Sequence, residues 1–173
     1  ERWLKTTAGY RYSKECLLFG SKWKSILQQE DGPFIDENFY GSNIASYKKQ
    51  LCALGVITDI NSGCPLMANF LDFHTEFKAI TRIYEYLYRF DWKPSDEGSK
   101  RIWIPSDNSN GEWVSPEKCV LHDTLGLFGS QLYVLEKHYQ KDILSFFSSA
   151  FGVKANPSLD DYCKLWKIWE DSN

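Results

Sequence analysis

The sequence predicts a mostly helical α+β fold with one small antiparallel β-ribbon. Two observations predict the helices: apolar residues recur at helical spacing, and Ser, Gly and Pro residues stand where such segments begin and end. A third observation predicts the ribbon. Two short runs of aromatic and β-branched residues, at 101–104 and 112–114, flank a loop rich in Ser, Asn, Asp and Gly. We expect this ribbon between two helical halves, followed by a C-terminal αα-hairpin.

The front half is predicted to contain two extended pieces joined by a turn, three helices and one strand. Ser residues can cap the helix starts, and Gly and Pro residues mark the breaks between elements. The expected extended pieces are 3–4 and 10–12, the helices are 22–29 after Ser21, 43–54 after Ser42 and a long one after Thr75, the strand is 56–58, and 61–65 is a loop.

The back half is predicted to contain three helices after the ribbon, over 131–139, 141–151 and from Ser158 onward. Gly152 is expected to end the second helix, and Asp161 stands three residues after Ser158, as in a capping box. The second and third helices form the expected αα-hairpin, packed on the ribbon. In the third helix the apolar residues expected to share one face are Leu159, Tyr162, Leu165, Trp166 and Trp169.

The length and composition fit one compact module. The chain has 173 residues, of which 16% are aromatic. A chain of this length can bury roughly 70% of its unfolded surface, and abundant aromatic residues are typical of a packed core. We therefore expect a single module over 1–173. The loop at 94–98 allows two subdomains within it, 1–93 and 99–173.

Charge and cysteine content limit the class of protein. A net charge of −3 argues against a broad phosphate-binding surface. Five dispersed cysteines, with no C-x-x-C pair, favour buried reduced thiols in an intracellular protein of the nucleus or cytoplasm. No apolar run has the length of a signal peptide or a membrane span, so no membrane partner is expected. The first residue is not Met, which predicts a piece excised from a larger protein.

The sequence contains no motif that assembles a catalytic, cofactor or metal site. Cys119 and His122 have the spacing of zinc ligands, but no second pair supplies the two further ligands that a zinc site needs. Phosphate-binding glycine motifs are absent as well. We therefore expect no enzyme activity, cofactor or metal in this segment. The alternative of an unrecognised enzyme predicts a pocket in which His122 or His138 meets a carboxylate or a thiol.

The seven Trp residues predict an interaction surface, because Trp and Tyr dominate the energetics of protein interfaces. The expected partners are other proteins or neighbouring repeats of the same chain. A nucleic-acid surface is the alternative, and its candidates are Lys22, Lys24, Lys48 and Lys49. The candidate residues of the protein-interaction surface are Trp3, Trp23, Trp92, Trp113 and Trp169.

Four stretches of the chain carry a resemblance to a known family. They are ERWLKTTAGYRYSKECLLFGSKW, FIDENFYGSNIASYKKQLCALGV, IWIP with GEWVSPEKCVLHD, and FFSSAFGVKANPSLDDYCKLWKIWE. These stretches resemble the repeated middle region of large plant proteins related to NO VEIN and sacsin, and Gly41, Gly55, Gly129 and Gly152 match the turn and cap positions of that pattern. The resemblance covers nearly the whole chain.

The resemblance implies a noncatalytic module of a large intracellular protein that acts like a chaperone or a nuclear regulator. Proteins of this family carry an ATPase domain of the histidine-kinase, gyrase and heat-shock-chaperone type near their N-terminus. The ATP site of that domain depends on an Asn-bearing helix and an Asp-x-Gly-x-Gly turn. Neither occurs here, so the resemblance assigns no nucleotide site to this chain.

Overall fold

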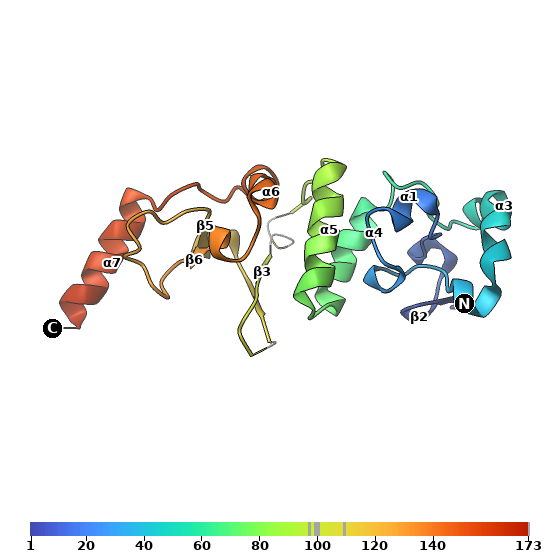
Figure 1. Ribbon diagram of the computed structural model, residues 1–173, viewed down its shortest axis with the longest axis horizontal. Helices are drawn as coiled ribbons and strands as arrows, with labels where there is room; N and C mark the ends of the chain where they lie inside the picture. The colour runs from blue at the N-terminus through green and yellow to red at the C-terminus, as the bar shows by residue number, and fades with distance from the viewer. Residues whose placement is uncertain (97, 99–100, 109, 173) are drawn as a thin grey trace. The chain divides into compact units, whose positions relative to one another are not determined.

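The structure is a computed structural model that describes residues 1–96, 98, 101–108 and 110–172. It is a mixed α+β fold with 49% helix and 12% strand, so the predicted fold class is confirmed. The strands form small two-stranded sheets (Figure 1). The chain divides into two compact units, Glu1–Trp92 (unit 1) and Lys93–Asn173 (unit 2). Among the helices of the described residues, none has the length and apolar character of a membrane span.

Unit 1 combines one β-hairpin with five α-helices. In the hairpin Leu4 pairs with Arg11 and Lys5 pairs with Tyr10, which confirms the two predicted extended pieces. Short 3₁₀ turns connect several of the elements. The strands are β1 (Leu4–Thr6) and β2 (Gly9–Arg11), and the helices are α1 (Ser21–Lys24), α2 (Glu37–Tyr40), α3 (Lys48–Ala53), α4 (Cys64–Phe70) and α5 (Phe77–Arg89).

The core of unit 1 is built around the buried indole of Trp23. Its ring lies 5.3 Å from the ring of Phe34 and 5.5 Å from that of Tyr86, measured between centroids. Leu17 is fully buried and forms single β-bridges to Phe34 and to Ile57. The amphipathic helix α5, which contains Tyr86, packs its apolar side against this core, as its apolar spacing predicted.

Several predicted elements of unit 1 are wrong in extent. The predicted helix over 22–29 stops at Lys24, where the Ser25 hydroxyl bonds to a carbonyl of the helix, and a 3₁₀ turn, Gln29–Asp31, follows. Ser42 does not cap a helix, because the segment from Ser42 to Tyr47 is itself 3₁₀. The predicted strand at 56–58 is a single bridge at Ile57.

The predicted loop at 61–65 is correct for 61–63, which form a turn, and wrong for its last two residues, because helix α4 begins at Cys64. Pro65 lies in the first turn of this helix. A proline there loses no helical hydrogen bond, since the first N–H groups of a helix have no partner within it. The proline at this position therefore marks the start of a helix and not a loop.

Unit 2 contains the predicted ribbon, a second strand pair and two long helices. In the ribbon Ile102 pairs with Val114 and Trp103 with Trp113, and the strands are antiparallel as predicted. The second pair is parallel, with Val120 opposite Val134. The strands are β3 (Ile102–Ile104), β4 (Glu112–Val114), β5 (Cys119–Val120) and β6 (Tyr133–Val134), and the helices are α6 (Lys141–Phe151) and α7 (Leu159–Asp171).

The helix predicted over 131–139 is wrong. Tyr133 and Val134 form strand β6, and a 3₁₀ turn follows from Leu135 to Lys137. Tyr and Val favour extended backbone, and the partner strand β5 satisfies their backbone groups. Because that partner lies 14 positions earlier in the chain, helical spacing within the segment gave a misleading signal.

The two C-terminal helices occur where the sequence predicts them. Gly152 ends α6 in the left-handed conformation, with φ of 69°, and Ser158 and Asp161 form a reciprocal capping box at the start of α7. The segment before α6 contacts the ribbon, because the Tyr139 hydroxyl donates to the carbonyl of Trp103. Figure 1 shows α7 on the side of unit 2 away from β3.

Candidate interaction surfaces

The candidate tryptophans do not share one environment. Trp3 and Trp169 are exposed, by 46% and 45%, and Trp92 and Trp113 are half-buried. Trp23 is only 1% exposed, so its predicted surface position is wrong. Its ring fills the core of unit 1, and its Nε1–H points to the carbonyl of Thr58. The remaining tryptophans are the buried Trp103 and the strongly exposed Trp166.

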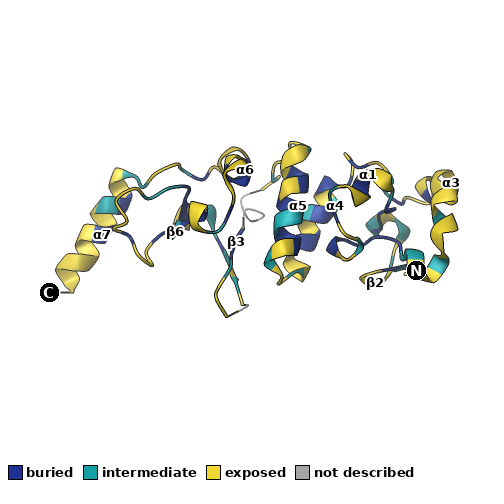
Figure 2. Ribbon diagram, viewed as in Figure 1, coloured by how far each residue is buried: buried dark blue, intermediate teal, exposed yellow. Residues whose placement is uncertain are grey.

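Helix α7 leaves most of its predicted apolar face uncovered. Leu165 is buried in a cluster with Val120, Phe128, Leu132 and Val134, and Tyr162 packs against this cluster. Every residue after Leu165 in this helix is exposed, as the yellow length of α7 in Figure 2 shows. The expectation that the whole face packs on the fold is therefore wrong. Three exposed apolar residues lie on one side of the helix and are called here the α7 face: Leu159, Trp166 and Trp169. The exposed Ile168 lies further round the helix, on the other side of Leu165.

A groove of about 230 Å³ runs beside α7. Its apolar lining combines residues of the helix with residues of the loop before β6, and polar side chains complete its lining. Apolar surface with polar groups around it is the arrangement of protein–protein interfaces. The apolar lining consists of Phe128, Leu132, Leu165 and Ile168, and the polar lining of Glu117, Lys118, Gln131, Asp161 and Lys164.

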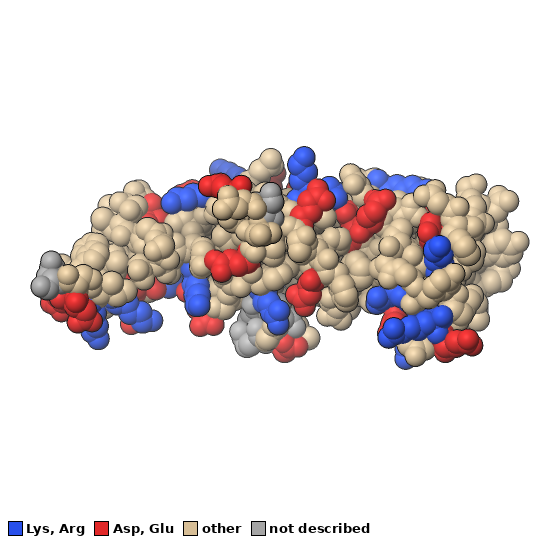
Figure 3. All heavy atoms as spheres, turned by 90° about the horizontal axis from the view of Figure 1, so that it is seen from below, with Lys and Arg blue, Asp and Glu red and all other residues tan. Residues whose placement is uncertain are grey.

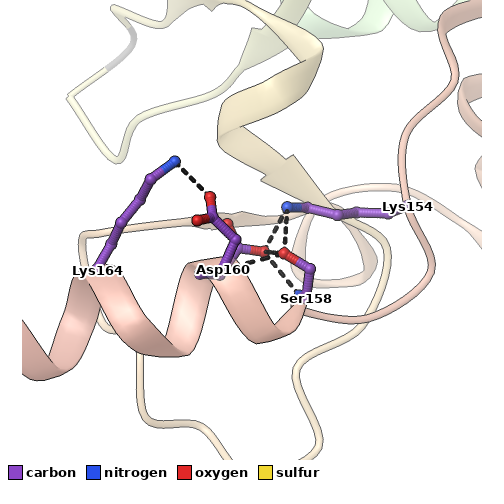
Figure 4. Close-up of polar contacts among 5 residues, drawn as sticks. Lys154, Ser158, Asp160 and Lys164 are labelled. Carbon is purple, nitrogen blue, oxygen red and sulfur yellow. Dashed lines mark hydrogen bonds and ion pairs between the residues drawn. The ribbon is translucent and has the colours of Figure 1, made fainter.

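The start of α7 is held by a compact polar network (Figure 4). The carboxylate of Asp161 accepts hydrogen bonds from the backbone N–H of Ser158 at 2.8 Å and from its hydroxyl at 2.9 Å, and it pairs with the Lys154 ammonium. Burial raises the pKa of Asp161, but these hydrogen bonds together outweigh burial and hold the pKa below its usual value. On the exposed side, Lys164 pairs with Asp160 at 2.7 Å. The network fixes the N-terminal end of α7, which is the end nearest the buried cluster around Leu165.

A second exposed aromatic surface lies on the β1–β2 hairpin. Leu4 points into the core of unit 1, so side chains at alternate positions of β1 point outward. Lys5 and its partner Tyr10 therefore lie on the outer side. Trp3, two residues before Lys5, and Tyr12, two residues after Tyr10, lie on the same outer side. Phe39 of α2 lies beside them, because the Lys5 ammonium is 4.4 Å from the centre of its ring. The hairpin face is defined here by Trp3, Tyr10, Tyr12 and Phe39, all exposed.

Two cations lie on the hairpin face. Lys5 contacts the ring of Phe39, and the Arg2 guanidinium lies 5.6 Å from the ring centre of Tyr12. In the part of the chain that the structure describes, neither cation forms an ion pair. The face therefore combines exposed rings with positive charge that no carboxylate neutralises. Trp3 was the only residue of this face among the sequence candidates. The alternation of the hairpin is the signal that identifies Tyr10 and Tyr12, whereas Phe39 lies in α2 and is placed here only by its contact with Lys5.

The structure brings together two of the four lysines of the alternative nucleic-acid surface, Lys22 and Lys48. Lys24 pairs with Glu37 at 3.2 Å. Lys22 and Lys48 line a hollow of about 160 Å³ that also contains the carboxylate of Asp59. On the molecular face in Figure 3, basic and acidic side chains are interspersed in both units. Nucleic-acid binding through these lysines stays a prediction.

The histidines lie in separate environments. His122 Nδ1 is 2.7 Å from the carboxylate of Glu136, on the surface. His138 lines a hollow of about 520 Å³ with Asp107 and Glu112. Burial and the nearby Lys137 lower the pKa of His138 against the opposing effect of Asp107. The hollow thus brings His138 to two acidic residues, as the alternative of an unrecognised enzyme predicts, and its lining includes neither His122 nor a cysteine. Enzyme activity at this hollow stays a prediction.

The five cysteines are free thiols in two classes. Cys16, Cys64 and Cys119 are buried, as predicted, whereas Cys52 and Cys163 are exposed, which corrects the expectation of buried thiols for these two. Burial raises the pKa of Cys16 to about 11 and that of Cys119 to about 12. Within the described ranges, no group of three or more His, Cys, Asp and Glu residues has the arrangement of a metal site.

Comparisons of the chain with family models, curated proteins and solved structures gave no match.

Proposed function

We propose that this chain is a noncatalytic protein-interaction module, and that the α7 face is its main contact surface. The observation that carries the proposal is the uncovered apolar stripe of α7. Leu165 packs in the core of unit 2, whereas Trp169, on the same side of the helix, is exposed. A partner that extends the packing along this stripe buries surface that is now in contact with water, which favours binding.

Two further features support this proposal. The groove beside the stripe offers a partner an apolar lining next to polar groups, so that an inserted side chain can be oriented by hydrogen bonds. Trp166, 62% exposed, keeps its Nε1–H bonded to Glu170 within its own helix. This hydrogen bond favours one orientation of the ring, which reduces the entropy that a partner must remove on binding.

The sequence resemblance gives this proposal a context. We propose that the module belongs to the middle region of a large intracellular chaperone-like protein related to NO VEIN and sacsin. In such a protein the partner of the α7 face is another protein or a neighbouring repeat of the same chain. Nucleic-acid binding through the four lysines and enzyme activity at a histidine remain the competing hypotheses. Neither has a feature comparable to the apolar stripe of α7.

A selection of displayed random peptides on the immobilised chain tests the proposal. We expect the selected peptides to bind at the α7 face, because exposed Trp next to a groove is the usual composition of an interface hot spot. Trp166→Ser and Trp169→Ser should each weaken their binding by about 2 kcal/mol or more. Tyr47→Ser is the matched control, since Tyr47 is an exposed aromatic residue of unit 1. Peptides that bind the wild-type chain and Trp166→Ser equally would refute the proposal.

A further inference from the structure

The geometry of the β1–β2 hairpin points to a second binding function, and we propose that the hairpin face binds single-stranded nucleic acid. This surface lies in unit 1 and shares no residue with the α7 face. The proposal is therefore independent of the protein-interaction function.

Four exposed rings of the hairpin face offer stacking positions for bases. Trp3, Tyr10 and Tyr12 lie on one side of the hairpin, opposite the buried Leu4, and Phe39 extends this side. Successive bases of a single strand stack on such rings, because every base presents a flat π face. The rings are positioned by the fold: the Tyr40 hydroxyl accepts from the backbone N–H of Lys5, and Asp36 caps α2 next to Phe39.

The hairpin face is also positively charged. The first 14 residues contain four basic residues and one acidic residue, whereas the whole chain is acidic. Arg2 and Lys5 lie among the rings and have no ion pair in the residues that the structure describes. Arg11, by contrast, points to the opposite side, where its Nε donates to the carbonyl of Glu15. The outer side of the hairpin therefore offers unneutralised positive charge for phosphates.

Rings and cations together distinguish between possible ligands. A peptide of Asp and Glu residues satisfies the two cations but has no flat group for each ring. A single strand brings a base and a phosphate with every nucleotide, so it matches both features of the face. A duplex hides its bases in the stack and offers only phosphates. The combination of rings and cations thus favours a single strand over either competitor.

Fluorescence anisotropy with labelled oligo-dT and oligo-U of about 12 nucleotides tests the proposal. We expect both to bind more tightly than a duplex of the same length, and Trp3→Ala and Tyr10→Ala each to weaken binding by about 5- to 150-fold. Two phosphate contacts give a slope of about −1.4 for log K against log salt concentration. The Arg2→Gln/Lys5→Gln variant should bring this slope close to zero.

The matched control is Tyr47→Ala. Tyr47 is 54% exposed and Tyr10 is 52% exposed, but Tyr47 adjoins Lys48 of the alternative lysine surface. Binding that falls with Tyr47→Ala/Lys48→Gln and not with Tyr10→Ala assigns the activity to the lysines and overturns the proposal. A lack of binding to either oligonucleotide also overturns it. The same holds if an oligo-Glu peptide binds as tightly as oligo-U. Thermal unfolding of each variant confirms that the hairpin is still folded.

Discussion

The guanidinium of Arg82 donates two hydrogen bonds of 2.7 Å to the buried carboxylate of Asp31. Asp31 lies in the 3₁₀ turn after α1, and its carboxylate also accepts from the backbone N–H of Gln28 at 2.8 Å. The turn is tied to α5 a second time, because His74 Nε2, at the entry to that helix, lies 2.6 Å from the carbonyl of Asp31. The ion pair of Arg82 and Asp31 joins segments 51 positions apart and holds the turn on the core of unit 1.

Removing the cation of this pair should strongly destabilise unit 1. We expect Arg82→Met to lower the free energy of unfolding by about 3 to 5 kcal/mol, because the Asp31 carboxylate stays buried without its counter-charge. Arg89→Met, at an exposed position of the same helix, should change it by less than about 0.5 kcal/mol. Urea denaturation measures both. If the Arg82→Met/Asp31→Asn variant is no more stable than Arg82→Met, the buried charge is not the cause.

The close approach of Gly63 to the central tryptophan predicts a second stability effect. A Cβ at Gly63 would lie 2.2 Å from the Trp23 ring and 2.9 Å from the Tyr86 hydroxyl oxygen. Gly63→Ala should therefore cost about 1 to 3 kcal/mol through overpacking. Gly20→Ala is the control, because its Cβ meets the same ring at an ordinary 3.7 Å. Equal melting temperatures for the two variants would show that the core around Trp23 is looser than described.

The network at the start of α7 should make unit 2 stability depend on pH. The folded pKa of Asp161 lies below the value of about 3.9 in an unfolded chain. Its stabilisation is therefore complete above the unfolded value and is lost as the pH falls through the folded value. Asp161→Asn should cost about 1 to 3 kcal/mol at pH 7, and this difference should shrink below about pH 4. A difference that is constant down to pH 2 contradicts the assigned role.

The two classes of cysteine should react at different rates. A thiol reagent should label Cys52 and Cys163 in the native chain, because both are exposed. Cys16, Cys64 and Cys119 should react only after denaturation, since burial restricts access and raises the pKa of each thiol. Mass spectrometry of the labelled peptides separates the classes. Fast native labelling of Cys119 would be inconsistent with the core of unit 2.

Local sequence signals were sufficient for the elements whose partners lie close in the chain. Ser158 and Asp161 cap α7 through contacts three residues apart, and Gly152 ends α6 through its own backbone conformation. Strand β6 was missed because its partner β5 lies elsewhere in the chain. Helix α4 was missed because a proline such as Pro65 occurs both in loops and in the first turn of a helix, so its presence alone does not separate the two.

The candidate surfaces were only partly predictable for a related reason. Helical spacing shows that Leu165 and Trp169 share a side of α7, but it does not show where the supporting core ends. Leu165 is covered and Trp169 is not, and only the position of Phe128 and Leu132 decides this. Trp23 was placed on the surface because its burial depends on Phe34 and Tyr86, which are 11 and 63 positions away in the sequence.

We propose that the exposed aromatic residues of α7 contact another protein, and hydroxyl-radical footprinting of the natural protein, in buffer and in an extract of the cells that make it, is the sharpest test of this contact. If a partner covers the helix, oxidation of Trp166 and Trp169 is slower in the extract, while oxidation of the exposed Tyr47 is unchanged. Equal oxidation rates of both tryptophans in the two conditions would rule the contact out.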